Sequence, residues 1–229
     1  MKEAPRQLVF DLPHRQALGH EDFLAGTSNA AALATVDQWP NWPHWAVVVE
    51  GPAHSGKSHL GQVWRLKSGA EAVFARDLDQ DAVAGLRERR ALLIENLEEG
   101  VADERVLFHL LNLAREQKMS ILMTTRVAPG ELKITLPDLR SRLRAVPRVE
   151  IGPPDDAILG AVLVKHFADR QLSIDPSVVS YLLVRLDRSF AAALEVVEEI
   201  DRRSLATHRR VTRQLAGEAI VALGRDNAM

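Results

Sequence analysis

The sequence predicts an α/β fold with a parallel sheet, followed by a small all-helical domain. The first observation is a set of short, nearly continuous apolar runs at 46–50, 91–95, 120–125 and 146–151, with a weaker fifth at 72–75. Such runs are typical of parallel strands that helices cover on both faces. The second observation is that helical segments separate these runs, which is the alternation of a layered α/β fold. The third is that no strand pattern follows the double proline at 153–154.

Length and composition narrow the class of protein. At roughly 150 residues per domain, 229 residues make one large domain, or a domain with a small lid. Lys and Arg number 29 against 31 Asp and Glu, which argues against a broad basic face for nucleic acid. The absence of cysteine excludes disulfides, Cys-ligated zinc and thiol nucleophiles. Without a membrane-length apolar run or a secretory signal, we expect a cytoplasmic protein.

The elements follow in order along the chain. Residues 1–15 predict an extended arm, because prolines bracket a stretch that lacks a helical period. Residues 27–38 predict a helix that Ser28 caps. Its buried face is expected to contain Ala31, Ala32 and Val36. Residues 39–45 hold three of the four tryptophans and two prolines, which favours a hydrophobic plug over the sheet edge; stacking on a base or a partner is the alternative.

Further helical patterns complete the division into domains. Residues 103–118 predict an amphipathic helix with a face formed by Val106, Leu107, Leu110, Leu111 and Ala114. After the double proline, helices are expected to about 170 and then at about 176–186, 189–205 and 212–223. The predicted organisation is therefore an arm at 1–15, a nucleotide-binding base at 16–152 and a helical lid at 153–229.

A glycine-rich loop carries the strongest functional signal. Residues 51–58, Gly-Pro-Ala-His-Ser-Gly-Lys-Ser, match G-x-x-x-x-G-K-S between a predicted strand and a predicted helix. The glycines allow backbone N–H groups to point at phosphate oxygens, and the helix N-terminus adds its dipole. Lys57 is expected to bridge the β- and γ-phosphates, and the Ser58 hydroxyl to ligate Mg²⁺. The alternative is a glycine turn with a solvated lysine.

A phosphate-loop ATPase also needs an acidic residue at the end of a neighbouring strand, and Glu95 occupies that place. It can reach a Mg²⁺-bound water, or it can be merely structural. The usual next residue is a glutamate that activates water, but this chain has Asn96, which cannot accept a proton and can only orient a water. Loss of a general base costs ~10²–10⁴ in rate, so weak or no intrinsic hydrolysis is expected.

With these motifs placed, the chain resembles AAA+ proteins of the DnaA clade, and within it the short Hda regulators, which lack DnaA's DNA-binding domain. Residues 23–31, including Asn29, are similar to the clade's adenine-pocket segment F-x-x-G-x-x-N-x-x-A. The sequence of the phosphate loop is close to that of the clade, including the His59 and Leu60 that follow it. Residues 136–143 resemble the segment that carries the arginine finger, which corresponds to Arg142. The helical tail resembles the AAA+ lid.

The resemblance implies a function. Hda-type proteins, bound to ADP and docked on the DNA-loaded sliding clamp of DNA polymerase III, stimulate DnaA to hydrolyse its ATP and so prevent re-initiation. Arg142 would act in trans on the DnaA nucleotide. The clamp peptide Q-L-x-L-x-L is similar to residues 7–12, and its binding residues would be Gln7, Leu8, Phe10 and Leu12. Without the family, the same arm would be expected to pack on its own domain.

The resemblance also implies a set of nucleotide-binding residues: Asn29, Gly51, Pro52, Ala53, His54, Ser55, Gly56, Lys57, Ser58, His59, Glu95, Asn96 and Thr125. The cofactor would be ADP or ATP with Mg²⁺, which Ser58 and Glu95 would contact. Three positions depart from the clade's pattern: Asn96, Thr125 at the sensor-1 position and Ala191 at the sensor-2 position. Arg188, nearly one turn earlier, is a candidate substitute for the sensor-2 arginine but is not assigned that role. These departures favour an ADP-holding regulator over a cycling motor, and the sequence does not fix the preference for ADP or ATP.

Alternative functions stay open at this point. One is a self-cycling AAA+ ATPase, such as a helicase or clamp loader, and another is a scaffold that binds DnaA and clamp without catalysis. Homo-oligomers are plausible partners because AAA+ domains place nucleotide at subunit interfaces. The arginines around Arg142 favour a solvated face with acidic partners over a nucleic-acid patch. Those at 202–210 are expected to balance Glu195, Glu198 and Glu199, with a weak contact to DNA or DnaA as the alternative.

Overall fold

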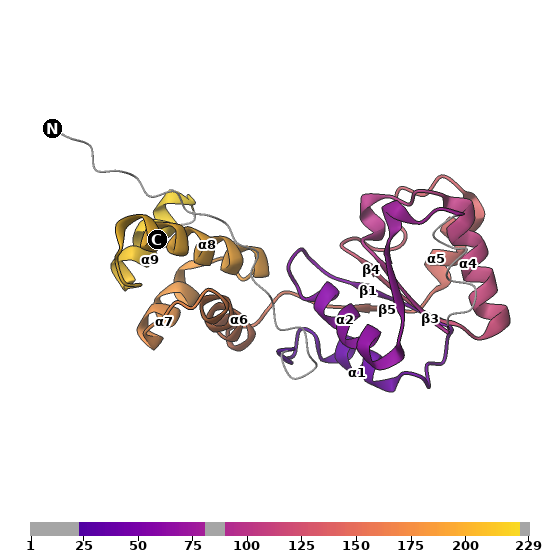
Figure 1. Ribbon diagram of the computed structural model, residues 1–229, viewed down its shortest axis with the longest axis horizontal. Helices are drawn as coiled ribbons and strands as arrows, with labels where there is room; N and C mark the ends of the chain where they lie inside the picture. Colours follow the sequence, from indigo (N-terminus) through magenta and orange to yellow (C-terminus); the bar gives the residue numbers. More distant parts are fainter. Residues whose placement is uncertain (1–22, 81–89, 225–229) are drawn as a thin grey trace. The chain divides into compact units, whose positions relative to one another are not determined.

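The computed structural model describes residues 23–80 and 90–224. These residues divide into two compact units, one that ends at Gly152 and one that begins at Pro153 (Figure 1). The predicted arm at 1–15, with its clamp-binding residues, lies outside the described residues.

The first unit is built on a five-stranded sheet in the order β2-β3-β4-β1-β5, with every neighbouring pair parallel. The strands are β1 (Ala46–Glu50), β2 (Glu71–Phe74), β3 (Ala91–Glu95), β4 (Ser120–Thr125) and β5 (Arg148–Glu150). Because all strands run the same way, their carboxyl ends share one edge of the sheet, where β1 leads into the glycine-rich loop. The predicted fold class is confirmed.

Helices cover both faces of this sheet (Figure 1). Helices α4 (Glu104–Gln117) and α5 (Pro137–Ala145) pack on one face, where Val48 and Ile94 point. Helices α1 (Ala30–Gln38) and α2 (Lys57–Ser68) pack on the other, where Val49 and Leu93 point. Burial on both faces explains why the strands read as continuous apolar runs. The five residues predicted for the face of α4 are all buried.

Two predicted elements need correction at their ends. The first helix begins at Ala30, three residues late, because Asn29 occupies the N-cap position, so Ser28 is not the cap and Ala31 is exposed. The last strand covers only Arg148–Glu150, because Val146 terminates α5 by donating its N–H to carbonyls of that helix's last turn. Strand β2 lies at the sheet edge and alternates in burial, which explains its weaker signal.

The tryptophans form part of the core on the α1–α2 face. The Trp42 ring stacks on Trp64 with centroids 5.3 Å apart, and Trp39 meets the same ring edge-on at 6.2 Å. Trp42 Nε1 donates to the Thr35 carbonyl at 2.6 Å, and Trp39 Nε1 donates to a serine hydroxyl in β4 at 3.0 Å. The hydrophobic-plug interpretation is therefore confirmed for Trp39 and Trp42.

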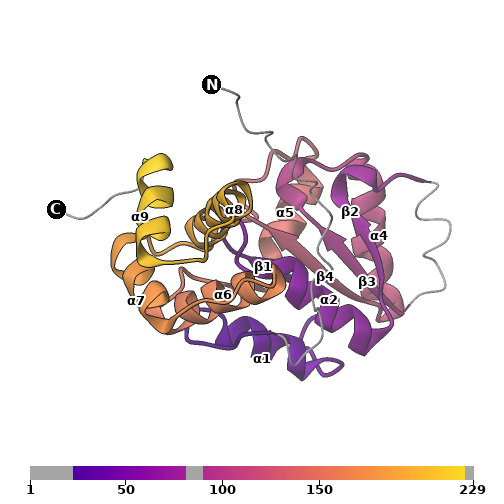
Figure 2. The same ribbon diagram turned by 60° about the vertical axis from the view of Figure 1, so that its left-hand side comes forward.

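The second unit contains four helices: α6 (Asp156–Asp169), α7 (Pro176–Arg185), α8 (Phe190–Thr207) and α9 (Arg213–Ala222) (Figure 2). Each begins with a side-chain oxygen that accepts a hydrogen bond from a backbone N–H in its first turn; the capping residues are Asp155, Asp175, Ser189 and Thr212. The apolar faces meet in one core. No helix among the described residues is long and apolar enough to cross a membrane.

Candidate functional site

The glycine-rich loop follows β1 and forms a tight turn before α2. His54 and Gly56 have positive φ angles of 61° and 88°, and Gly56 occupies the N-cap position of α2. At Gly51, an added Cβ would lie 2.9 Å from both the Ile151 carbonyl oxygen and Ser55 Oγ, which is closer than real Cβ contacts allow. The backbone therefore approaches its neighbours closely enough that glycine is needed at the start of the loop.

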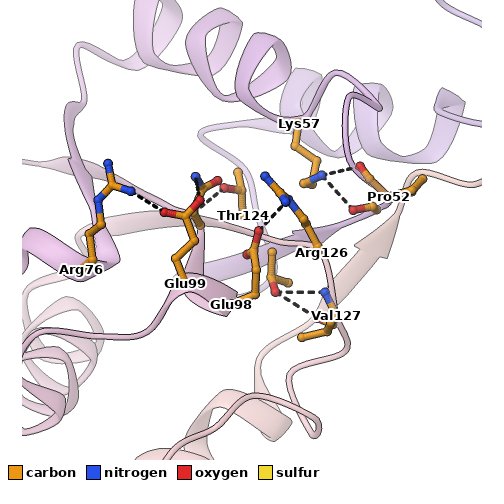
Figure 3. Close-up of polar contacts among 11 residues, drawn as sticks. Pro52, Lys57, Arg76, Glu98, Glu99, Thr124, Arg126 and Val127 are labelled. Atoms are coloured by element: carbon orange, nitrogen blue, oxygen red, sulfur yellow. Dashed lines mark hydrogen bonds and ion pairs between the residues drawn. The ribbon is translucent and has the colours of Figure 1, made fainter. Parts of the chain in front are cut away.

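Lys57, the first residue of α2, lies inside this loop with 6% of its surface exposed. Its ammonium donates hydrogen bonds to the carbonyl oxygens of Gly51 at 2.8 Å and Pro52 at 2.6 Å (Figure 3). Loss of solvation lowers the pKa of Lys57 to about 8; the nearby Glu98 carboxylate opposes this change, and the Arg126 guanidinium adds to it. A buried cation with a lowered pKa is suited to an anionic ligand.

The loop residues fit a polyphosphate with bound Mg²⁺. Ser55 Oγ is buried and makes no hydrogen bond to the described protein, although buried hydroxyls are nearly always satisfied. Ser58 is exposed in the first turn of α2, and Glu95 is half-buried at the end of β3. The backbone N–H groups of the loop and Lys57 would hold the phosphates. Ser58 would ligate the Mg²⁺, and Glu95 would contact a water bound to it.

Polar contacts at the end of β3 engage Asn96, which has a φ of 60°. Its backbone N–H donates to Thr124 Oγ1 at 3.0 Å, and its side-chain amide donates to Glu99 Oε1 at 2.8 Å. Glu99 in turn pairs with Arg76 at 2.7 Å (Figure 3). The amide that was predicted to orient a water is thus used within the protein.

Thr125, predicted at the sensor-1 position, is completely buried. Its hydroxyl donates to the Val127 carbonyl at 3.0 Å and accepts from the Val127 N–H at 3.3 Å, so it closes the turn after β4 (Figure 3). These two bonds use the donor and one lone pair of the hydroxyl. The Thr125 hydroxyl therefore has at most one lone pair left for the predicted contact with a water beside the phosphate.

The predicted adenine-pocket segment lies beside the glycine-rich loop. Asn29 is buried, accepts a hydrogen bond from Gly26 N–H at 2.9 Å and donates to the Leu24 carbonyl at 2.7 Å, so it shapes the segment from within. The Phe23 ring meets the His59 ring of α2 edge-on, with centroids 5.3 Å apart. The structure thus brings residues 23–31 and 51–59 together, and it gives Asn29 a structural role that sequence reasoning had not assigned.

Four arginines gather at and after α5, and their side chains differ in what they contact. The Arg142 guanidinium lies over the Phe108 ring of α4, 5.1 Å from its centroid, and forms no hydrogen bond or ion pair with a residue that the structure describes. The other three have polar partners: Arg140 at the Ile134 carbonyl, Arg144 at the Gly130 carbonyl and Arg148 at the Glu50 carboxylate. Arg142 is therefore distinguished from its neighbours.

Comparisons with known proteins agree with this geometry. Residues 156–216 match the family model described as "Hda, lid domain". Residues 156–216 are therefore similar to the lid domain of Hda proteins. Domain III of the Thermotoga maritima replication initiation protein DnaA is similar over 95% of this chain and 100% of its own, with 18% identity and a TM-score of 0.74.

Two further solved structures show the same AAA+ fold. Aquifex aeolicus DnaA, in a structure bound to AMPPCP, is 20% identical with a TM-score of 0.64, over 82% of this chain and 67% of its own. The Thermotoga maritima RuvB Holliday junction branch migration motor is 14% identical with a TM-score of 0.68, over 90% of this chain and 72% of its own.

In the Hda-type lid, Ala191 lies in the first turn of α8, at the predicted sensor-2 position. Arg188, the considered substitute, pairs with Asp156 at 3.1 Å within the lid, and both side chains are well exposed. The basic stretch is only partly balanced as predicted, because Arg202 and Arg203 pair with Glu199. Arg170 pairs with Glu198 and Arg209 with Glu218, neither of which sequence reasoning anticipated.

Sequence reasoning missed two charged residues of this AAA+ site. Glu98 follows β3 by three residues, and Arg126 immediately follows β4. Arg126 Nε lies 3.0 Å from Glu98 Oε1 (Figure 3). The available signal was their position: each lies within three residues of the carboxyl end of a strand, at the same sheet edge as the phosphate loop.

Proposed function

We propose that this protein is a nucleotide-holding regulator of the replication initiator DnaA. The glycine-rich loop, with its buried Lys57 and unsatisfied Ser55 hydroxyl, supports binding of ADP or ATP with Mg²⁺. The AMPPCP carried by the similar Aquifex aeolicus DnaA supports the same proposal. The Hda-type lid supports the connection to DnaA. The proposed base spans residues 16–152 and the lid 153–229.

Features of the site favour holding nucleotide over turning it over. Asn96 supplies no base, and its amide is bonded to Glu99. Thr125 is uncharged and closes its own turn. Ala191 supplies no cation from the lid. A site without a general base and without these γ-phosphate contacts is expected to hydrolyse ATP slowly and to lean toward ADP.

The proposed activity is stimulation of DnaA's own ATP hydrolysis by Arg142, acting in trans as an arginine finger. The observation that carries it is that the Arg142 guanidinium rests on Phe108 without a polar partner among the described residues, whereas its three neighbours are engaged. A cation that is positioned but not neutralised can stabilise charge on a transferring phosphate, which is worth ~10³–10⁵ in rate. Docking on the sliding clamp is assigned to Gln7, Leu8, Phe10 and Leu12.

The test measures hydrolysis of DnaA-bound ATP in the presence of this protein, ADP and DNA-loaded clamp. Arg142→Ala should abolish stimulation. Arg144→Ala, on the same helix, is the matched control, because its side chain bonds a loop carbonyl at 3.4 Å. Gln7→Ala should lose the dependence on clamp. Stimulation that survives Arg142→Ala would instead indicate a scaffold, and turnover of several per second by the isolated protein would indicate a self-cycling motor.

A further inference from the structure

The proposed function leaves two charges at the phosphate loop without a role, those of Arg126 and Glu98. Strand register places Arg126 at the loop. Thr125 is the β4 partner of Glu50, and the Gly51 N–H donates to the Thr125 carbonyl at 3.1 Å. Arg126 is therefore the first residue after β4, next to the point where the loop leaves the sheet.

The charges at this point are closely coupled. Both carboxylate oxygens of Glu98 are buried, and the side chain is 12% exposed, so its charge is poorly solvated and is balanced by Arg126 at 3.0 Å. Both charges also act on Lys57, in opposite directions. Arg126 thus pairs with a buried carboxylate whose charge also acts on Lys57 (Figure 3). The Arg126 side chain is 50% exposed, so its guanidinium can exchange one anionic partner for another.

We propose that Arg126 is a second phosphate-binding cation of the site, and that Glu98 holds it until the phosphates of a nucleotide replace the carboxylate. This inference rests on the proposed nucleotide binding. Arginine suits this role because its planar fork binds phosphate oxygens in pairs and its charge persists at every physiological pH. Arg126 thus gives the site a second cation from this chain's own base. The two sensor positions, Thr125 and Ala191, supply no cation. Glu98 then acts as a competitor of the ligand.

The experiment is isothermal titration of the whole protein with ADP and, separately, with AMPPCP, both with Mg²⁺. Arg126→Gln should weaken at least one of the two ligands about tenfold to a hundredfold, the range expected for loss of a charge-assisted hydrogen bond. Glu98→Gln should tighten the same ligand about threefold or more, because Arg126 is released and a like charge is removed. Opposite signs for two partners of one ion pair are not expected from structural damage.

Arg76→Gln is the matched control, because Arg76 is 56% exposed and pairs with Glu99 at 2.7 Å in the same region; it should stay within about twofold of wild type. Lys57→Ala shows how much binding is lost when the phosphate site itself is removed. If Arg126→Gln binds both ligands within twofold of wild type while Lys57→Ala binds neither, the role of Arg126 is refuted and nucleotide binding stands. If Glu98→Gln weakens binding, the competition is refuted. If wild type binds neither ligand, the proposed function itself is refuted.

Discussion

Burial of Lys57 should make the free energy of unfolding of the nucleotide-binding base depend on pH. Substitution of Lys57 should remove that dependence. The pKa of Lys57 falls from 10.5 to about 8 on folding, so the unfolded chain binds more protons between these two values. The free energy of unfolding must therefore rise as the pH increases through this window, and be insensitive to this residue below pH 8. Integration gives a gain of about 2.5 kcal/mol between pH 7 and pH 10.

The perturbation is Lys57→Met, which keeps the length of the side chain and removes its charge. All four tryptophans (39, 42, 45 and 64) belong to the base, so urea unfolding followed by their fluorescence reports this unit alone. The wild-type free energy of unfolding, minus that of the variant, should increase by about 2.5 kcal/mol from pH 7 to pH 10, because all other titrating groups cancel in the difference.

The matched control is Lys67→Met, which removes a lysine near the other end of α2 whose side chain is 39% exposed. It measures what the loss of a more exposed lysine from the same helix does over the same pH range. A flat difference for Lys57→Met would refute the reasoning, since it would mean that the ammonium is no less solvated in the folded protein than in the unfolded chain. A falling difference would mean that the two carbonyl bonds outweigh the lost solvation.

Three further predictions follow from single contacts. Phe108→Leu should reduce the stimulation of DnaA about threefold to tenfold without changing ADP affinity, because the cation–π contact that orients Arg142 is worth ~0.5–2 kcal/mol. Stimulation equal to that of wild type in the hydrolysis assay would contradict this prediction. Gly51→Ala should destabilise the base by about 1–3 kcal/mol in urea unfolding, because its Cβ would meet a backbone carbonyl at 2.9 Å; Gly130→Ala, with 3.5 Å to a flexible side chain, should cost much less. Asp155→Ala should cost the lid about 1 kcal/mol by removing the cap of α6, and an unchanged melting temperature by calorimetry would refute that role.

The sequence predicted those parts of the fold that depend on local pattern. The bounds of β1, β3 and β4 agree with the predicted runs, because strands buried on both faces must be apolar at every position. The lid helices were located to within about two residues by their capping side chains and prolines. The face of α4 followed from its 3.6-residue period, since that face packs on one sheet surface.

Features that depend on tertiary contacts were not predictable from local pattern. Ser28 was a plausible cap, but the fold uses Asn29 to bond the turn before α1. The ion pair of Glu98 with Arg126 joins the ends of two strands, and neither residue belongs to a motif. In the same way, the distinction of Arg142 from three neighbouring arginines requires the carbonyls and carboxylate that engage the others.

The two halves of the proposed function have a common physical basis. An arginine finger is effective only if its charge is not neutralised before it reaches the phosphate, and the base leaves Arg142 on an aromatic ring while it engages Arg140, Arg144 and Arg148. At the nucleotide loop, by contrast, Asn96 is tied to its own neighbour and supplies no base. A protein that activates hydrolysis in a partner benefits from slow hydrolysis of its own, because its bound nucleotide then keeps the base in one state while the finger acts.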